Sequence, residues 1–301
     1  MSNKRLLSRG LIRRGAIVAA VLASVASPAF AGWGGLNMTR GVTELSEIIY
    51  DLHMEILWVC VVIAVAVFGA MIYFVVRFRK SRGAVPDTSL LHSNKAELIW
   101  TVIPVVILVM MAVPAAKALI RIEDTRNSEL TIKVTGYQWK WQFDYLGSGV
   151  NFFSTLAESS NFARQKGSGI DPNTVENYLL ESDHHLVIPL DTKVRLLLTA
   201  NDVIHAWWVP AFGMKKDAIP GFVNEMWIKA HTTGTYRGQC AELCGRDHGF
   251  MPIVVDVVSK EEFARWLESQ KSATDAAPLV PAAQSAPPAD GATPAASSTN
   301  S

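Results

Sequence analysis

Two long apolar runs lie in the first half of the chain. The first covers residues 56–77 and the second residues 98–120, where Lys117 is the single charge. Each run approaches or exceeds the roughly 20 residues that a helix needs to cross a bilayer. Pro104 and Pro114 are tolerated in such helices, because other groups can re-satisfy the carbonyls that proline leaves free. The pattern predicts an α-helical transmembrane hairpin with two spans.

After residue 121 these long apolar runs give way to short stretches in which apolar and polar residues alternate. The stretch 137–145, YQWKWQFDY, alternates aromatic and polar residues and predicts a strand. Similar short runs follow at 185–190, 193–200, 223–230 and 251–258, and only 260–270 has a helical pattern. Short strands at regular spacing predict a sandwich or barrel, so 122–271 is interpreted as an all-β domain. The polar, glycine-rich stretch 147–177 is interpreted as a surface insertion.

The two ends of the chain differ from both patterns. Residues 1–31 hold a basic start, a short apolar stretch and Ala29-Phe30-Ala31, which predicts a signal peptide cleaved before Gly32. A retained membrane anchor is the alternative. Residues 272–301 are nearly all Ala, Pro, Ser, Thr and Gly, a composition that predicts a disordered tail. Residues 32–121 then form the N-terminal segment and the hairpin.

Charge predicts the orientation of the hairpin. The loop between the spans carries five basic residues against Asp87, namely Arg77, Arg79, Lys80, Arg82 and Lys95. The positive-inside rule places this loop in the cytoplasm and the all-β domain outside, as a cleaved signal peptide also requires. The formal net charge of +1 argues against a nucleic-acid-binding protein.

The stretch 239–251, QCAELCGRDHGFM, holds two of the three cysteines of the chain. Cys240 and Cys244 are followed by His248 and Met251, and His205 lies upstream in NDVIHAWWVP. Thiolates, imidazoles and a thioether form a soft ligand set that favours copper. A zinc site would use the Cys and His residues but leave Met251 without a role.

Other interpretations of these residues stay open from the pattern alone. Cys240 and Cys244 could form a disulfide, His248 could be a surface residue and Met251 a core residue. A membrane-tethered copper carrier or thiol-disulfide protein is a second functional class. A carrier needs an exposed, exchangeable site, and a disulfide protein would have no use for His205 and Met251. The chain lacks a C-x-x-C-H motif for haem attachment, so any electrons that a copper site here accepts would come from a separate protein.

From the first span to about residue 270 the chain resembles subunit II of haem-copper cytochrome c oxidases of the alphaproteobacterial type. The matching blocks include AELIWTVIPV, GYQWKW, DVIHAWWVP, MKKDAIPG and GQCAELCGRDHGFMPIVV. The resemblance implies a cupredoxin-like Greek-key barrel in the periplasm, anchored in the bacterial inner membrane. It also implies a function: electrons pass one at a time from cytochrome c to a binuclear copper centre, CuA, and then to haem in subunit I. There oxygen is reduced to water and protons are translocated.

The resemblance also assigns roles at the copper centre. It implies two bridging thiolates, two terminal imidazoles and two weak ligands, namely Cys240 and Cys244, His205 and His248, and Met251 and the backbone carbonyl of Glu242. The side chain of Glu242 would reach a magnesium or manganese ion at the boundary with subunit I, unless it is an ordinary loop carboxylate. Cys60 lies in the first span and is interpreted as an apolar filler.

Two further roles come from the resemblance. Trp139 would receive electrons where cytochrome c docks, although it also suits a packed strand face. Lys140 replaces an aromatic residue usual in the family and an acidic run is missing, so the donor could be soluble or membrane-bound. The remaining candidate acidic contacts are Asp144, Asp183, Asp202 and Glu242. Glu97 would lie near the mouth of a proton path into subunit I, or form a helix capping box with Asn94.

Overall fold

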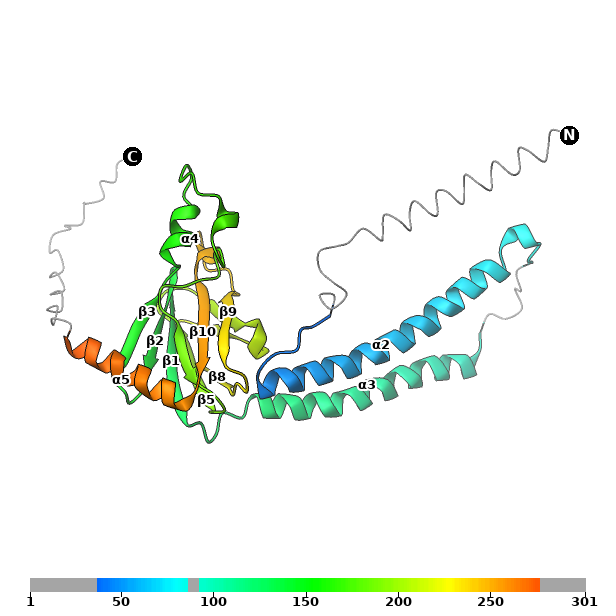
Figure 1. Ribbon diagram of the computed structural model, residues 1–301. Coiled ribbons are helices and arrows are strands. Elements are labelled where there is room, and N and C mark those ends of the chain that lie inside the picture. The colour runs from blue at the N-terminus through cyan, green and yellow to red at the C-terminus, as the bar shows by residue number, and fades with distance from the viewer. Residues whose placement is uncertain (1–36, 86–91, 277–301) are drawn as a thin grey trace, which may run out of the picture.

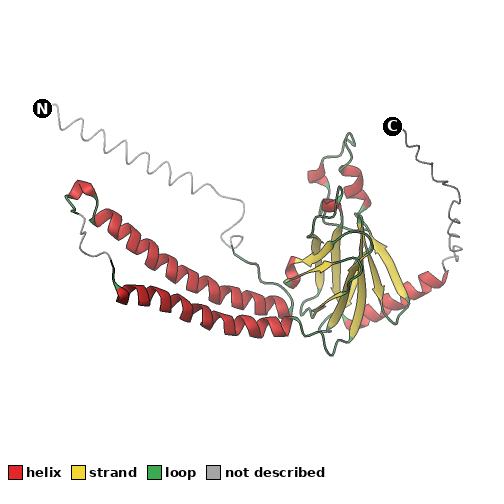
Figure 2. Cartoon of the chain, turned by 180° about the vertical axis from the view of Figure 1, so that it is seen from behind, coloured by secondary structure: helices red, strands yellow, loops and turns green. Residues whose placement is uncertain are grey.

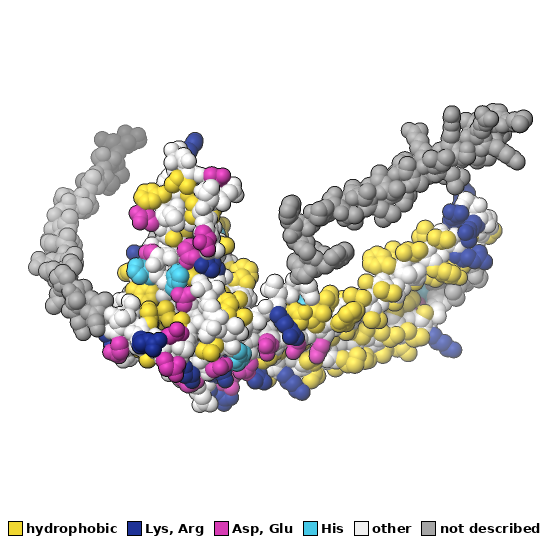
Figure 3. Space-filling view, viewed as in Figure 1, with side chains coloured by type: hydrophobic (Ala, Val, Ile, Leu, Met, Phe, Trp, Pro, Cys, Tyr) yellow, Lys and Arg dark blue, Asp and Glu magenta, His cyan; other side chains and the backbone are white. Residues whose placement is uncertain are grey.

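The computed structural model describes residues 37–85 and 92–276, and it contains a helical hairpin joined to a β domain (Figure 1). Helices α2 (Glu44–Arg77) and α3 (Asn94–Ile122) run side by side, and a short 3-10 turn, η2 (Lys80–Arg82), follows α2. Both helices are long and apolar enough to cross a membrane. They contain the two predicted spans: α2 begins before the first span and ends with it at Arg77, whereas α3 extends beyond the second span at both ends. The space-filling view shows the apolar band and the Lys and Arg side chains at its distal end (Figure 3).

The β domain is a sandwich of two five-stranded sheets (Figure 2). The first sheet has the order β3-β2-β1-β5-β8 and the second has the order β4-β10-β9-β6-β7. The strands are β1 (Leu130–Tyr137), β2 (Lys140–Tyr145), β3 (Val150–Ser154), β4 (Leu186–Pro189), β5 (Val194–Ala200), β6 (His205–Val209), β7 (Met214–Ala218), β8 (Asn224–Ile228), β9 (Gly234–Cys240) and β10 (Pro252–Val258). The predicted all-β, cupredoxin-like class is confirmed, and its strand order is non-sequential, as in Greek-key folds.

The core lies between the sheets and is rich in aromatic side chains. Trp141, Phe143 and Tyr145 alternate inward along β2 and are fully buried. Helix α5 (Lys260–Ala276) closes one side of this core, where the Trp266 ring lies 5.1 Å from that of Tyr145. The period-two pattern therefore gives the buried face of β2 correctly.

Two details of the sequence interpretation are corrected by the structure. The stretch 137–145 is not one strand, because the chain turns back at Gln138 and Trp139 between β1 and β2. Trp139 therefore sits in a turn instead of sharing a strand face with Trp141. The supposed insertion 147–177 contributes β3 to the first sheet, together with the short helices α4 (Glu158–Ala163) and η3 (Pro172–Thr174).

The ends of the chain fall largely outside the described residues. This applies to the predicted signal peptide at 1–31 and to most of the predicted tail at 272–301. Helix α5 continues past residue 271 to Ala276.

Backbone hydrogen bonds join the start of α2 to the β domain. The amide of Val42 donates to the carbonyl of Ala211 at 2.9 Å, and the amide of His231 donates to the carbonyl of Val42 at 2.9 Å. Thr43 caps α2 by accepting a hydrogen bond from the amide of Ser46, whose hydroxyl in turn accepts from the amide of Thr43. These contacts hold the domain at the end of the hairpin, next to the predicted membrane surface.

Candidate metal centre

The candidate site is built on the connection between two adjacent strands. β9 ends at Cys240 and its antiparallel neighbour β10 begins at Pro252, so the ends of the loop between them must meet. The amide of Cys240 donates to the carbonyl of Met251 at 3.3 Å. Pairing within the sheet therefore brings the first and last of the four candidate ligands in this loop together.

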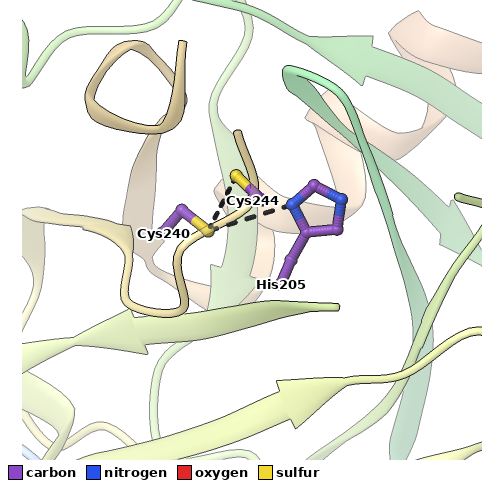
Figure 4. A group of neighbouring side chains, drawn as sticks. All are labelled: His205, Cys240 and Cys244. Atoms are coloured by element: carbon purple, nitrogen blue, oxygen red, sulfur yellow. Dashed lines mark hydrogen bonds between the residues drawn. The ribbon is translucent and has the colours of Figure 1, made fainter. Parts of the chain in front are cut away.

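His205 reaches the loop from the other side of β9. It is the first residue of β6, which pairs with β9 through Trp207 and Cys240. The amide of Ala241 donates to the carbonyl of Ala206 at 2.9 Å, which extends the contact into the loop. Figure 4 shows the imidazole of His205 facing the sulphur atoms of Cys240 and Cys244.

The potential donor atoms lie close to one another. The two cysteine Sγ atoms are 3.8 Å apart and are not bonded to each other. Cys240 Sγ lies 3.9 Å from His205 Nδ1 and 3.4 Å from the carbonyl oxygen of Glu242. Cys244 Sγ lies 3.5 Å from His248 Nδ1 and 3.5 Å from Met251 Sδ. The six predicted donors thus form two groups, one around each sulphur.

These distances suit bound metal. With metal–sulphur bonds of about 2.3 Å and metal–nitrogen bonds of about 2.0 Å, tetrahedral donors lie roughly 3.5 Å apart. Cys240, Cys244, His205 and Met251 are buried, whereas His248 is partly exposed. Four of the five donor side chains are therefore shielded from water, and their chemistry fits copper.

The two thiols can both be ionised only if a positive charge lies close to them. Burial disfavours ionisation of both, but hydrogen bonds from His205 and backbone amides lower the pKa of Cys240. Burial and the neighbouring charge of Cys240 raise the pKa of Cys244 to about 12. Without metal, only one of the two ionises readily, because two thiolates this close repel each other. A bound cation removes that obstacle, since a coordinating thiol is deprotonated outright.

The second nitrogen of His205 is held by a carboxylate. His205 Nε2 lies 3.0 Å from Asp202 Oδ1, and Asp202 also accepts hydrogen bonds from the amides of Gln138 and Val203. Burial opposes the charged imidazole, but hydrogen bonds with Cys240 and Asp202 raise the pKa of His205 overall. A carboxylate behind a ligating histidine fixes the ring and its tautomer. The sequence suggested Asp202 only as a docking contact, and the structure places it against the ring of the candidate ligand His205.

The β1–β2 turn covers the same site. Gln138 Nε2 donates to the carbonyl of Cys244 at 2.8 Å, and Trp139 Nε1 donates to the same oxygen at 3.1 Å. A Cβ atom added to Gly136 would lie 2.7 Å from His205 Cδ2, so only glycine leaves room for the imidazole. Sequence reasoning did not identify Gly136 or Gln138 as parts of the site. The sequence feature that could have identified them is their position beside Trp139 in the block GYQWKW.

The other predicted site residues lie elsewhere or lack contacts. The side chain of Glu242 is exposed at the tip of the loop. Glu97 lies in the first turn of α3, far along the hairpin from the β domain, with its carboxylate 3.9 Å from His92 Nδ1. The alternative of a capping box with Asn94 is wrong, because Ser93 is the N-cap and accepts from the amide of Ala96. The carboxylate of Asp183 accepts hydrogen bonds from the amide and the hydroxyl of Thr155.

A membrane hairpin that carries a cupredoxin-like sandwich with a buried cluster of soft donor side chains defines a class of membrane-anchored redox domains. Two family patterns match this chain: "Cytochrome C oxidase subunit II, periplasmic domain" over residues 130–258, and the corresponding transmembrane domain over residues 31–118. A probable cytochrome c oxidase subunit 2 of Rickettsia bellii is 40% identical over 76% of this chain and 81% of its own length. The subunit of Cereibacter sphaeroides is 34% identical over 80% and 82%. The chain therefore belongs to the cytochrome c oxidase subunit II family.

Solved structures are also similar in sequence. One of them is the crystal structure of the periplasmic domain of subunit II of cytochrome oxidase of Bradyrhizobium japonicum. It is 42% identical, covers 50% of this chain and 98% of that chain, and superimposes with a TM-score of 0.43.

Proposed function

We propose that the β domain holds a binuclear copper centre, CuA, through which the chain serves as the electron-accepting subunit of its oxidase complex. Cys240 and Cys244 would bridge two copper ions, His205 and His248 would bind one each, and Met251 and the carbonyl of Glu242 would be weak ligands. The observation that supports this most is the arrangement of donors in two groups around two adjacent sulphur atoms. Copper bound here would supply one-electron redox chemistry shared over both thiolates.

The residues around the donors would keep that site rigid and dry. Asp202 orients His205 from behind, and the β1–β2 turn ties the loop carbonyl of Cys244 to β1 and β2. Fixed ligands move little when the oxidation state changes, which keeps the reorganisation energy of electron transfer small. Trp139 is partly exposed, and its indole N–H donates a hydrogen bond to the carbonyl of Cys244, a proposed ligand. It is therefore our candidate for the residue that receives electrons from cytochrome c.

The remaining assignments belong to the same proposal. We place the β domain in the periplasm of a bacterial inner membrane, with the basic loop between the spans in the cytoplasm. Electrons would pass to haem in subunit I, where oxygen is reduced, and membrane lipid and further oxidase subunits would surround the hairpin. A magnesium or manganese ion would bind at the exposed side chain of Glu242, and Glu97 would serve proton uptake.

A membrane-tethered copper carrier is the competing function. A carrier must release its metal, which requires exposed ligands, whereas Cys240, Cys244, His205 and Met251 are at most 6% exposed. The carboxylate and amide contacts behind these ligands also oppose release. The burial of the ligands therefore favours electron transfer over metal delivery.

The test is copper stoichiometry with electron paramagnetic resonance on the full chain, purified without partner subunits. We expect two copper ions per chain and one unpaired electron shared over both. Cys244→Ser should abolish that signal, while Cys60→Ser, which removes the cysteine in α2, should preserve it. A single exchangeable copper, or a metal-free disulfide between Cys240 and Cys244, would contradict the proposal and favour the carrier.

A further inference from the structure

A hollow lies between the two membrane helices at the end next to the β domain. Its volume is about 370 Å³. Four residues from each helix line it: Ile48, Asp51, Leu52 and Glu55 from α2, and Pro114, Lys117, Ala118 and Arg121 from α3. Apolar and charged side chains thus share one small space, and in Figure 3 charged side chains interrupt the apolar surface at this end of the hairpin.

The charges in the hollow are sorted by helix. Both acidic residues, Asp51 and Glu55, come from α2, and both basic residues, Lys117 and Arg121, come from α3. Within each pair the residues are four positions apart, so they lie on one face of their helix. Glu55 immediately precedes the first predicted span and Lys117 lies near the end of the second. The hollow is therefore at the boundary between the hydrocarbon core and the lipid headgroups.

Within the described part of the chain, no ion pair connects the two acidic residues that line the hollow with the two basic ones. Arg121 pairs with Glu44, outside the hollow, and Asp51 lies 3.8 Å from Arg40 with both side chains largely exposed. Among the described residues, neither Glu55 nor Lys117 has an ion pair or a side-chain hydrogen bond. Ionised groups at the edge of a membrane are costly unless a partner or water satisfies them. A ligand with both a negative and a positive group could bind both sets of charges at once.

We propose that this hollow binds the headgroup of a phospholipid that carries a phosphate and a primary ammonium group. The phosphate oxygens accept hydrogen bonds from Lys117 and Arg121, and the ammonium group donates to Glu55 and Asp51. Ile48 and Leu52 contact the glycerol and the start of the acyl chains. An anionic lipid without an ammonium group leaves Glu55 without a partner, whereas Asp51 has only its exposed ion pair with Arg40. A quaternary ammonium has no N–H to donate, so a choline headgroup is the weaker ligand.

The test measures which lipid stays bound to the protein. The full chain is reconstituted in nanodiscs of phosphatidylethanolamine and phosphatidylcholine in equal amounts, extracted with detergent and analysed by native mass spectrometry. We expect phosphatidylethanolamine to be retained in excess. Lys117→Met should reduce its retention about tenfold, because a charged hydrogen-bond donor is lost. Lys80→Met, at the other end of the hairpin, should leave it unchanged.

Glu55→Gln provides an independent variant, because it removes one negative charge and keeps the side-chain size. It should weaken the preference for phosphatidylethanolamine over phosphatidylcholine, and circular dichroism checks that each variant is folded. Equal retention of both lipids by the wild-type chain would overturn the proposal. So would a Lys117→Met variant that retains lipid normally but loses a neighbouring subunit from the purified oxidase complex, since the hollow would then be a protein interface. None of these outcomes depends on copper at the β domain.

Discussion

Two histidines on the same sheet have opposite surroundings. His205, at the start of β6, has one ring nitrogen near Asp202 and the other near the sulphur of Cys240. His185, just before β4, has Nδ1 at 2.8 Å from Asp256 and Nε2 at 2.8 Å from Glu181. A carboxylate only accepts hydrogen bonds, so both nitrogens of His185 must carry protons. The ring is therefore an imidazolium without a lone pair to offer a metal.

The neighbours of His185 complete a balanced ionic cluster. Arg237 pairs with Glu181, and Thr235 donates a hydrogen bond to Asp256 at 2.6 Å. The hydrogen bond with Asp256 is the main reason that the pKa of His185 is raised. The comparison shows that burial and a neighbouring acid do not by themselves make a histidine a metal ligand. What matters is whether the second nitrogen faces another acid or a soft donor.

The sharpest test of this comparison exchanges each histidine for alanine. His205→Ala should lose both copper ions, because it removes a terminal ligand and opens a cavity beside the two thiols. His185→Ala should still bind two copper ions per chain. Copper content and the paramagnetic resonance signal of the full chain measure both outcomes. Loss of copper from the His185 variant while it remains folded would mean that the two clusters are not independent.

A second variant displaces the ring of His205 without removing a donor atom. In Gly136→Ala the new methyl group would overlap the imidazole, since its carbon would lie 2.7 Å from Cδ2. The ring must move, so we expect nearly complete loss of the shared-electron signal together with a lower unfolding temperature. Overpacking of this kind costs about 1–3 kcal/mol. A normal copper signal in Gly136→Ala would show that β1 does not position the histidine.

Asp202→Asn tests the carboxylate behind His205. Removing such a partner typically reduces metal affinity about 10- to 100-fold, so the variant should lose copper to a competing chelator more readily. Asp144→Asn is the matched control, because Asp144 was also a candidate docking residue but lies in β2 without a contact to a ligand. If Asp202→Asn changes only the rate of reduction by cytochrome c and leaves copper affinity intact, its role is docking and not ligand support.

The sequence indicated the candidate ligands but not the residues that contact them, for a physical reason. Cys240, Cys244, His248 and Met251 lie in one loop, and their residue types carry the chemistry. Gly136 and Gln138 are ordinary residues that matter only because β1 ends beside the loop, which depends on the pairing of strands far apart in the chain. The period-two pattern gave the buried face of β2 but could not show the turn at Trp139, because a tight hairpin preserves the alternation of aromatic and polar residues.

The smallest expected effect concerns His185 and the pH dependence of stability. The folded-state pKa of His185 is raised, so its stabilising contribution is complete below the unfolded value of about 6.5 and is lost as pH rises through the folded value. Asp256 has a lowered pKa, despite burial that opposes this shift, because His185 and Thr235 donate hydrogen bonds to it. Its contribution is present above about pH 3.9 and is lost as pH falls through the lowered value. Between these limits the pair is fully ionised.

His185→Gln should therefore destabilise the β domain most between about pH 4.5 and 6.5, and less at pH 9. We expect about 1–2 kcal/mol at the acidic end, because the cluster is partly exposed and its charges are screened. In a domain of this size that corresponds to an unfolding temperature lower by roughly 2–8 °C, measured on the copper-free full chain. His231→Gln is the control, since one nitrogen of His231 contacts a single acid, Asp191, at the surface. A pH-independent difference for His185→Gln would mean that the ring is neutral in the folded protein, and the contrast with His205 would then rest on the thiols alone.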